Sequence, residues 1–322
     1  MRAMNTIPTT FNERRVPHTV IGGTVRKADE PVDALTVILL NRGGRFYRSA
    51  VFQNLESAGI VSVISVEMST ETYDVESLSA RFPRVKFLVP LEKVTVGELI
   101  NTAMAETQSP HVLVLWNDQR LPQTGLNPRV LEKLEEDPVL CTVPSLTGQR
   151  LESVPVCMVP AFSGRSLSVE PIPGARDQAL TAYAFDYSGV YDRQRFISLG
   201  GFDPAIVNPY WQNLDFGFRA YLWGERLAIS TSMRLTYEGE IPREDVTPDS
   251  SYITFYLKNL APVFGKKGIS LPRRAFLTLL AKGGMNFFEA FALFSRISRW
   301  IEDNRTRFVS DARRTISSWE LT

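Results

Sequence analysis

The sequence contains few of the residues that build covalent or histidine-based sites. Its 322 residues include only two cysteines, Cys141 and Cys157, which do not form a Cys-X-X-Cys motif. Its two histidines, His18 and His111, are too few for a zinc site built on histidines or for a histidine-based catalytic triad. A chain of this length and apolar content requires no disulfide staple, and a reducing compartment is the expected environment.

Long apolar runs and a strong net charge are also missing. No uninterrupted apolar stretch reaches the roughly 18 residues that a membrane-spanning helix requires, because the longest candidate, residues 287–294, contains Glu289. Residues 1–33 lack the apolar core of a signal peptide. A net charge of +1 provides no general field for binding nucleic acid. These absences predict a cytoplasmic protein. A cytoplasmic protein can also bind peripherally at the inner face of the membrane, and that location belongs to the prediction.

What the sequence does contain is a regular alternation of strand and helix patterns. Apolar, β-branched runs alternate with segments of helical spacing, which predicts an α/β fold with a Rossmann-like, mostly parallel sheet flanked by helices. The expected strands are residues 35–40, 60–66, 85–89, 111–115, 183–191 and 226–236. Ligands of such sheets bind at the carboxyl ends of the strands. The loops after Leu40, Val66 and Leu115 are therefore the expected places for chemistry.

Two stretches carry a recognisable pattern. The first is the apolar strand that ends in Trp116-Asn117-Asp118. The second is the turn of residues 199–204, which leads into residues 210–219 and then Gly224. Together they resemble inverting glycosyltransferases of the GT-A fold, family 2, over roughly residues 35–240. The resemblance implies a GT-A fold and transfer of a sugar from a nucleotide-sugar donor to a glycan or lipid-linked acceptor in surface-glycan assembly.

The resemblance assigns the donor side of the site to loops that follow the first strands. Asp118 matches the last acid of the family's Asp-X-Asp motif and is implied to hold a divalent metal, manganese or magnesium, or the donor diphosphate. Glu67 matches the acid that holds the nucleoside. The other matching donor-side residues are Asn41, Arg42, Gly97, Asn101 and Asn117. Ordinary structural roles also fit, since Asn-Asp pairs are common in turns.

The acceptor side is implied by the second stretch. Its glycine pair permits positive φ and close backbone approach. The matching acceptor-side residues are Gly200, Gly201, Phe202, Asp203 and Trp211. In the family a Glu-Asp pair follows and its Asp is the general base, whereas this chain has Gln212-Asn213. Amides do not accept a proton at neutral pH, so the candidate bases are Asp215, Asp203 or a residue that the pattern does not mark.

Three chemical positions depart from the family pattern: Trp116, Asn213 and Tyr237. Relatives place a histidine metal ligand near the last of these, and here Glu238 is the nearest candidate. Asp215 also lies four residues before Arg219, a spacing that is typical of an ion pair on a helix. The departures favour an alternative function, a catalytically silent GT-A protein that binds a glycan, a nucleotide or a partner enzyme.

A further alternative is a nucleotidyltransferase, which also uses a nucleotide-binding α/β sheet. Such an enzyme is expected to carry a Gly-X-Gly-X-Arg loop after the first strand. Gly43-Gly44-Arg45 matches that loop only in part.

The chain is expected to divide into an N-terminal arm (residues 1–33), a GT-A-like domain (residues 34–262) and a basic, helical C-terminal extension (residues 263–322). Apolar residues within 271–309 are expected to line one helix face. The partners expected for this face are the catalytic domain itself, a second subunit in a homodimer, or an anionic membrane surface.

Overall fold

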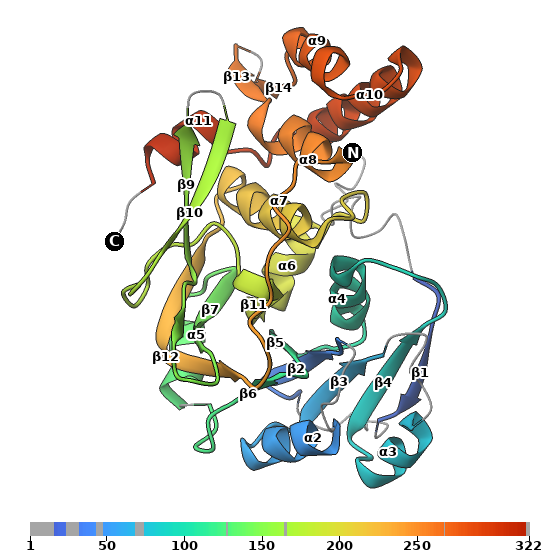
Figure 1. Ribbon diagram of the computed structural model, residues 1–322, viewed down its shortest axis with the longest axis vertical. Helices are drawn as coiled ribbons and strands as arrows, with labels where there is room; N and C mark the ends of the chain where they lie inside the picture. The colour runs from blue at the N-terminus through green and yellow to red at the C-terminus, as the bar shows by residue number, and fades with distance from the viewer. Residues whose placement is uncertain are drawn as a thin grey trace, which may run out of the picture.

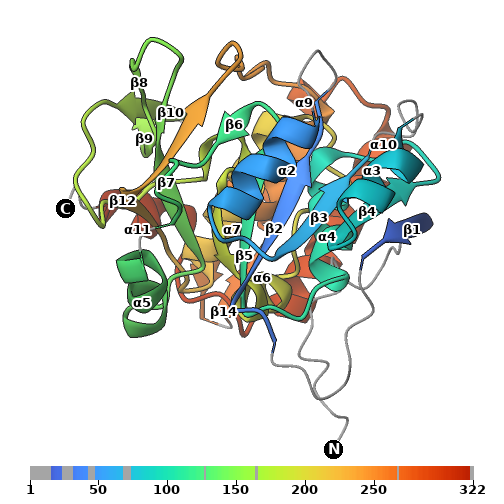
Figure 2. The ribbon, with the colours of Figure 1, turned by 90° about the horizontal axis from the view of Figure 1, so that it is seen from below.

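The computed structural model describes residues 16–23, 32–42, 48–67, 74–126, 128–163, 166–266 and 268–319. These residues form one ten-stranded mixed sheet with helices on both faces, together with a helical C-terminal region (Figure 1). Helices α2 and α3 cover one face of the sheet, and α4, α6 and α7 cover the other (Figure 2). The predicted α/β fold with a mostly parallel sheet and a helical C-terminal region is therefore confirmed.

The four strands predicted from the apolar runs form a parallel block in the order β4-β3-β2-β5. They are β2 (Leu35–Leu40), β3 (Ser62–Val66), β4 (Val85–Pro90) and β5 (His111–Trp116). Every residue of β2 is buried, as expected for a parallel strand that is covered on both faces. In the register, Leu40 lies opposite both Val66 and Trp116, so three strands end at one level.

The remaining strands extend this block in both directions. Next to β5 lies the antiparallel β11 (Gly189–Asp192), followed by β7 (Cys141–Thr147), β12 (Leu227–Tyr237) and β6 (Gln119–Arg120), with β8 (Ser153–Val154) pairing with β7. At the opposite edge, β1 (His18–Gly22) pairs with β4, so part of the stretch expected as an arm belongs to the sheet. Two hairpins complete the strands: β9 (Cys157–Ser163) with β10 (Ser166–Ile172), and β13 (Val263–Gly265) with β14 (Gly268–Ser270).

The expected strand over residues 183–191 is largely wrong. Only its last part belongs to β11, and the residues before it form a short 3-10 helix, Phe185–Tyr187. Asp186 and Tyr187 have φ values of 55° and 61°, in the left-handed region that strands do not use. The indole of Trp116 donates a hydrogen bond to the Asp186 carbonyl (2.9 Å), and this long-range contact helps to hold the turn.

Ten α-helices lie in the described residues. They are α2 (Arg48–Ser57), α3 (Val75–Arg81), α4 (Val96–Ala105), α5 (Pro128–Glu136), α6 (Arg193–Leu199), α7 (Pro209–Leu222), α8 (Ser250–Phe255), α9 (Arg273–Lys282), α10 (Phe287–Asn304) and α11 (Ala312–Ser317). Thr95 and Glu98 form a capping box at the start of α4. Asn208 caps α7, and Pro209 occupies its first turn, where the missing N–H costs no hydrogen bond. These local signals fix the starts of the two helices that flank the site.

The C-terminal helices pack on the domain through a second apolar core, separate from the main one. Ala290, Ile297 and Ile301 of α10 are buried in it. Phe287 and Phe291, expected on the same face, are instead exposed by 56% and 57% of their surface. Part of the apolar face of α10 is thus covered by other segments of this chain. None of the helices in the described ranges is both long and apolar enough to cross a membrane.

Candidate functional site

The ends of β2, β3 and β5 bring together the polar residues expected after them. The side chain of Asn41, after β2, donates hydrogen bonds to the Val66 carbonyl (2.9 Å) and the Ser65 hydroxyl (3.1 Å), and its Nδ2 lies 3.4 Å from Glu67 Oε1. The next residue along the chain, Arg42, reaches Asp118 after β5. The predicted placement of these residues at one edge of the sheet is therefore observed.

Glu67 is fully buried and already paired. Its Oε2 lies 2.6 Å from Nη1 of Arg48, and its Oε1 accepts a hydrogen bond from Ser65 (2.8 Å). A nucleoside that binds to this carboxylate has to share it with Arg48 at the start of α2. Residues 68–70, which follow Glu67, and Gly43-Gly44-Arg45 lie outside the described residues.

Arg42 is the centre of the charged cluster at this edge. Its Nε lies 3.2 Å from Asp118 Oδ2, and its Nη2 pairs with the carboxylate of Asp186. Its guanidinium also stacks on Trp116, 4.0 Å from the ring centroid. Trp116, which was expected at the first acid of an Asp-X-Asp motif, thus serves as a platform for the arginine. Arg42 keeps 27% of its side chain exposed, so an anion can still reach it.

The backbone of Arg42 is fixed as firmly as its side chain. Asn117 Oδ1 accepts a hydrogen bond from the Arg42 N–H, and Asn117 Nδ2 donates one to the Arg42 carbonyl, both at 3.3 Å. In turn, the Glu238 N–H donates to the Asp118 carbonyl (2.7 Å), which places Glu238 beside Asp118. The Glu238 carboxylate itself pairs with Arg120 at 2.5 Å. The two expected metal ligands are therefore neighbours, but each carboxylate is held by an arginine.

Asp186 is a site residue that the sequence did not reveal, since it lies in no motif. Burial raises its pKa to about 6, although the charge of Arg42 and a hydrogen bond from the Tyr237 hydroxyl (2.9 Å) act in the opposite direction. Burial likewise raises the pKa of Asp118, and Arg42 opposes that shift. Tyr237 thus contributes a hydroxyl to this cluster.

The carboxylates of Asp118 and Asp186 are the groups at this edge that could hold a divalent metal. Asp118 Oδ1 is buried and accepts no hydrogen bond, which leaves one oxygen for a cation. The space between Asp118 and Asp186, however, is bridged by the guanidinium of Arg42. In the described parts of the chain, no group of three or more Asp, Glu, His or Cys side chains is arranged to hold a metal ion. The two carboxylates therefore fit their ion pairs with the Arg42 side chain better than a shared divalent metal.

Glu244 is a second acidic residue that no sequence motif marks. It lies on the connection between β12 and α8, which runs past β11 and α7 (Figure 1, orange). Its Oε2 accepts a short hydrogen bond from the Tyr183 hydroxyl (2.6 Å). Burial, together with the nearby charge of Asp186, raises the pKa of Glu244 to about 7, and the Tyr183 hydrogen bond partly offsets this. A carboxyl group that titrates near neutrality is suited to accept a proton.

The amides expected at the catalytic position form structural contacts. Gln212 Oε1 accepts a hydrogen bond from the Gly97 N–H, and its Nε2 donates to Thr95 Oγ1 and to the Asp203 carbonyl, all at 2.9 Å. Asn213 Nδ2 donates to the Ala184 carbonyl (2.6 Å). Both side chains are buried. Their contacts hold the start of α7 against α4 and against the segment that carries Tyr183 and Asp186.

Gly97 and Asn101, expected on the donor side, join α4 to the glycine turn. Asn101 exchanges two hydrogen bonds with the backbone of Phe202, at 2.8 and 2.9 Å. Gly200 and Gly201 have φ values of 96° and 66°, so the turn uses the left-handed region that the glycine pair predicts. In this arrangement Gly97 and Asn101 position the acceptor-side turn.

Gly97→Ala should destabilise the protein, because the added Cβ would lie 2.4 Å from Phe202 Cβ and 2.5 Å from Gln212 Oε1. Overpacking of this kind costs about 1–3 kcal/mol in the free energy of unfolding. Urea titration followed by circular dichroism measures the loss. Gly265→Ala is the control, since its Cβ meets nothing closer than 3.9 Å. An unchanged midpoint for Gly97→Ala would contradict the close packing of α4 against α7.

Asp203 and Asp215 belong to a buried charge network behind the turn. Lys258 Nζ lies 2.6 Å from Asp203 Oδ2 and 2.9 Å from Asp215 Oδ1. Arg219 contacts Asp215 at 3.1 Å, as the helical spacing predicted, and Asn259 donates to the same carboxylate at 2.7 Å. Asp215 has no exposed surface. These contacts favour a structural role for Asp215.

Trp211, the remaining acceptor-side residue, anchors the connection that carries Glu244. Its indole N–H donates to the Thr247 carbonyl (2.9 Å), and the side chain is 6% exposed. The connection is therefore fixed at Tyr183 through Glu244 and at Trp211 through Thr247.

No protein-family model matches this sequence, and neither does any curated protein. Solved structures match it clearly. The crystal structure of GalNAc-T7 with UDP, GalNAc and Mn²⁺ aligns with a TM-score of 0.58 and 11% identity, covering 93% of this chain and 62% of that one. TarS of S. aureus aligns with a TM-score of 0.51 and 11% identity, covering 84% and 43%. TarS residues 1–349 in complex with UDP align with a TM-score of 0.50 and 12% identity, covering 85% and 73%.

This chain therefore spans less than two thirds of the first two structures that it resembles. At 11–12% identity the likeness shows the fold alone. That fold is a GT-A-like glycosyltransferase fold, in agreement with the expectation from the strand rhythm and the two motifs.

Proposed function

We propose that this protein is a glycosyltransferase that binds a nucleotide sugar at the edge formed by the ends of β2, β3 and β5, and transfers the sugar to a glycan or lipid-linked acceptor. The observation that carries the proposal is the position of Arg42. Its guanidinium lies between Asp118 and Asp186 at the carboxyl edge of a GT-A-like sheet, and it remains partly exposed. An arginine there can bind a diphosphate through charge-assisted hydrogen bonds.

Arg42 and Arg120 supply the positive charge on the donor side of the proposed reaction. Transfer leaves a nucleoside diphosphate, whose developing negative charge has to be balanced. Arg42 stacks on Trp116, and Arg120 donates to the carbonyls of Asn117 (2.8 Å) and Gln119 (2.9 Å). Both guanidinium groups are thus held in place before the donor arrives.

Glu244 is the proposed proton acceptor. The acceptor hydroxyl attacks the anomeric carbon, the new C–O bond forms as the bond to the diphosphate breaks, and the hydroxyl proton passes to the Glu244 carboxylate. One such displacement inverts the anomeric centre. Glu244 serves as the general base in place of Asn213, whose amide cannot accept a proton. The two residues bind neighbouring positions of the chain: Glu244 accepts a hydrogen bond from Tyr183, and Asn213 donates one to the carbonyl of Ala184.

A silent binding protein is the second candidate, and one observation favours it. Gln212 and Asn213, at the positions of the family's acidic pair, are both committed to hydrogen bonds that hold α7. In this case the same edge binds a nucleotide, a glycan or a partner enzyme, and no sugar is transferred. Product formation separates the two candidates, whereas nucleotide binding is common to both.

The donor site is tested by isothermal calorimetry with nucleoside diphosphates and their sugars, with and without manganese. The native protein should bind at least one of them, and Arg42→Ala should weaken that binding by at least about tenfold, the effect of losing one strong charge-assisted contact. Arg226→Ala is the matched control, because Arg226 pairs with Asp137 and about half of its side chain is exposed. No binding by the native protein, or equal affinities for Arg42→Ala and the control, would contradict the proposed site.

A further inference from the structure

The tip of the C-terminal helical region exposes a cluster of large apolar side chains, called here the phenylalanine patch. Its members are Leu277 on α9 and Phe287, Phe288 and Phe291 on α10, exposed by 67%, 56%, 81% and 57%. Phe276 joins them, with its ring centroid 5.8 Å from Phe287 and 6.4 Å from Phe291. In Figure 1, α9 and α10 lie at the end of the molecule farthest from α2 and α3. A group of exposed large apolar side chains of this kind is typical of an interaction site.

Basic residues accompany the patch. Arg273 lies one helical turn before Leu277, on the same side of α9, and Arg273, Arg274 and Lys266 are all exposed. Arg296 and Arg299 are exposed further along α10. Residues 265–322 carry a net charge of +6, whereas the rest of the chain carries −5. The net positive charge is thus concentrated in the segment that exposes its aromatic side chains, whereas the rest of the chain is net negative.

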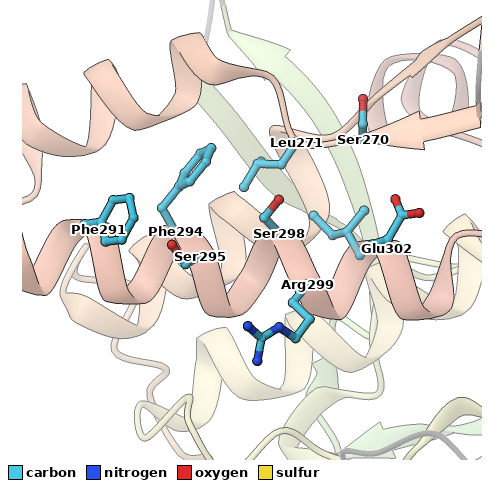
Figure 3. A pocket seen from close by; sticks show the side chains of 9 residues that line it. Ser270, Leu271, Phe291, Phe294, Ser295, Ser298, Arg299 and Glu302 are labelled. Atoms are coloured by element: carbon cyan, nitrogen blue, oxygen red, sulfur yellow. The ribbon is translucent and has the colours of Figure 1, made fainter.

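A groove extends the patch along α10. It has a volume of about 470 Å³ and lies between α10 and the segment of Ser270 and Leu271 (Figure 3). Its apolar lining consists of Leu271, Phe291, Phe294 and Ile301, and Ser295 and Ser298 supply hydroxyl groups. Phe291 belongs to both the patch and the groove. The apolar surface therefore continues from the exposed tip into a depression, whose lining also includes Arg299 and Glu302.

The charge distribution distinguishes between two partners that could cover the phenylalanine patch, a second copy of this chain and a lipid bilayer. A second copy of this chain in a two-fold dimer would place the same basic patch against itself, and the like charges would repel. An anionic bilayer offers both negative headgroups for the arginines and an apolar interior for the phenylalanines. The arrangement of aromatic side chains beside arginines is typical of helices that lie in the membrane interface.

We propose that the phenylalanine patch and its flanking arginines bind the surface of an anionic lipid bilayer, with α9 and α10 lying in the interface. This inference does not depend on the proposed function. If both hold, the bilayer would present a lipid-linked acceptor to a site carried by the same molecule.

Vesicle cosedimentation tests the proposal with the full chain. Binding to mixed phosphatidylglycerol and phosphatidylcholine vesicles should exceed binding to pure phosphatidylcholine by at least about tenfold, and salt should weaken it. Phe288→Ser with Phe291→Ser, and separately Arg273→Glu with Arg274→Glu, should each reduce binding by about tenfold or more. All these side chains are exposed, so the variants should fold, as circular dichroism will check.

The matched control compares two exposed leucines. Leu277→Ser should reduce vesicle binding, whereas Leu91→Ser, at a residue exposed by 64% next to the end of β4, should not. Equal binding to both vesicle types, or equal binding by the patch variants and the native protein, would overturn the proposal. A concentration-dependent dimer in sedimentation analysis that Phe288→Ser abolishes, without any vesicle binding, would assign the patch to a second subunit instead.

Discussion

Glu244→Gln should reduce the rate of sugar transfer by about 10²–10⁴-fold, the typical contribution of a general base, and leave the affinity for the nucleoside diphosphate unchanged. Glutamine keeps an oxygen that can accept the Tyr183 hydrogen bond (2.6 Å in the native protein), so the local structure should persist. What it loses is the capacity to take a proton. Steady-state transfer assays and calorimetry on the same preparations measure the two effects separately.

The pH dependence provides an independent check. Glu244 has a pKa of about 7, raised by burial, and the charged or titratable groups around it include Asp186, Tyr183, Tyr187 and Tyr210. A base acts when it is deprotonated, so the native transfer rate should rise with pH through about 7 and then level off. In Glu244→Gln this rise should disappear from the residual rate.

The matched control is Glu240→Gln, an exposed carboxyl on the same connection. It should transfer sugar at the native rate. Undiminished transfer by Glu244→Gln would place the base elsewhere in the site. If the native protein binds a nucleotide sugar but forms no product with any acceptor, the result would support the silent binding protein, and Asn213→Asp would then be the variant in which to look for gained activity.

Lys258→Met should destabilise the fold by about 3–5 kcal/mol, the range for breaking a buried ion pair at one partner. The lysine is 3% exposed and contacts two buried carboxylates, Asp203 and Asp215. Removing its charge leaves Asp203 without its ammonium partner and Asp215 with only Arg219 and Asn259. Urea unfolding monitored by circular dichroism gives the difference in free energy.

Lys133→Met is the control for this change. Lys133 pairs with Asp177 at 2.9 Å, but 46% of its side chain is exposed, and exposed pairs contribute about 0–1 kcal/mol. If Lys258→Met were no more destabilising than Lys133→Met, the network behind the glycine turn would not be a structural element, and Asp215 would return as a candidate base.

The predictable part of the architecture comes from local patterns. The apolar runs place β2 to β5 within a residue or two, and the alternation with helices predicts their parallel order at one sheet edge. The paired glycines at 200 and 201 predict the turn with positive φ. These features follow from the sequence because each depends on neighbouring residues, through periodicity or backbone freedom.

The identity of the site residues was only partly predictable. Arg42 and Asp118 follow strand ends, so sequence order alone places them at the edge. Asp186 and Glu244 follow no such rule. Asp186 reaches the site because a turn with positive φ interrupts the expected strand, and Glu244 because a long connection passes back over β11 and α7 (Figure 1). Both positions depend on contacts between residues far apart in the chain.

By itself, the sequence determined the α/β class and the sheet edge at which Arg42 and Asp118 lie, because residue type and strand periodicity are local properties. Only the tertiary structure decided how the remaining charges are paired. It set Arg42 between two carboxylates, committed Asp215 to Lys258, and brought Glu244 to Tyr183. Burial and charge pairing depend on which distant segments meet, and they determine whether an acid is a structural partner or a proton acceptor.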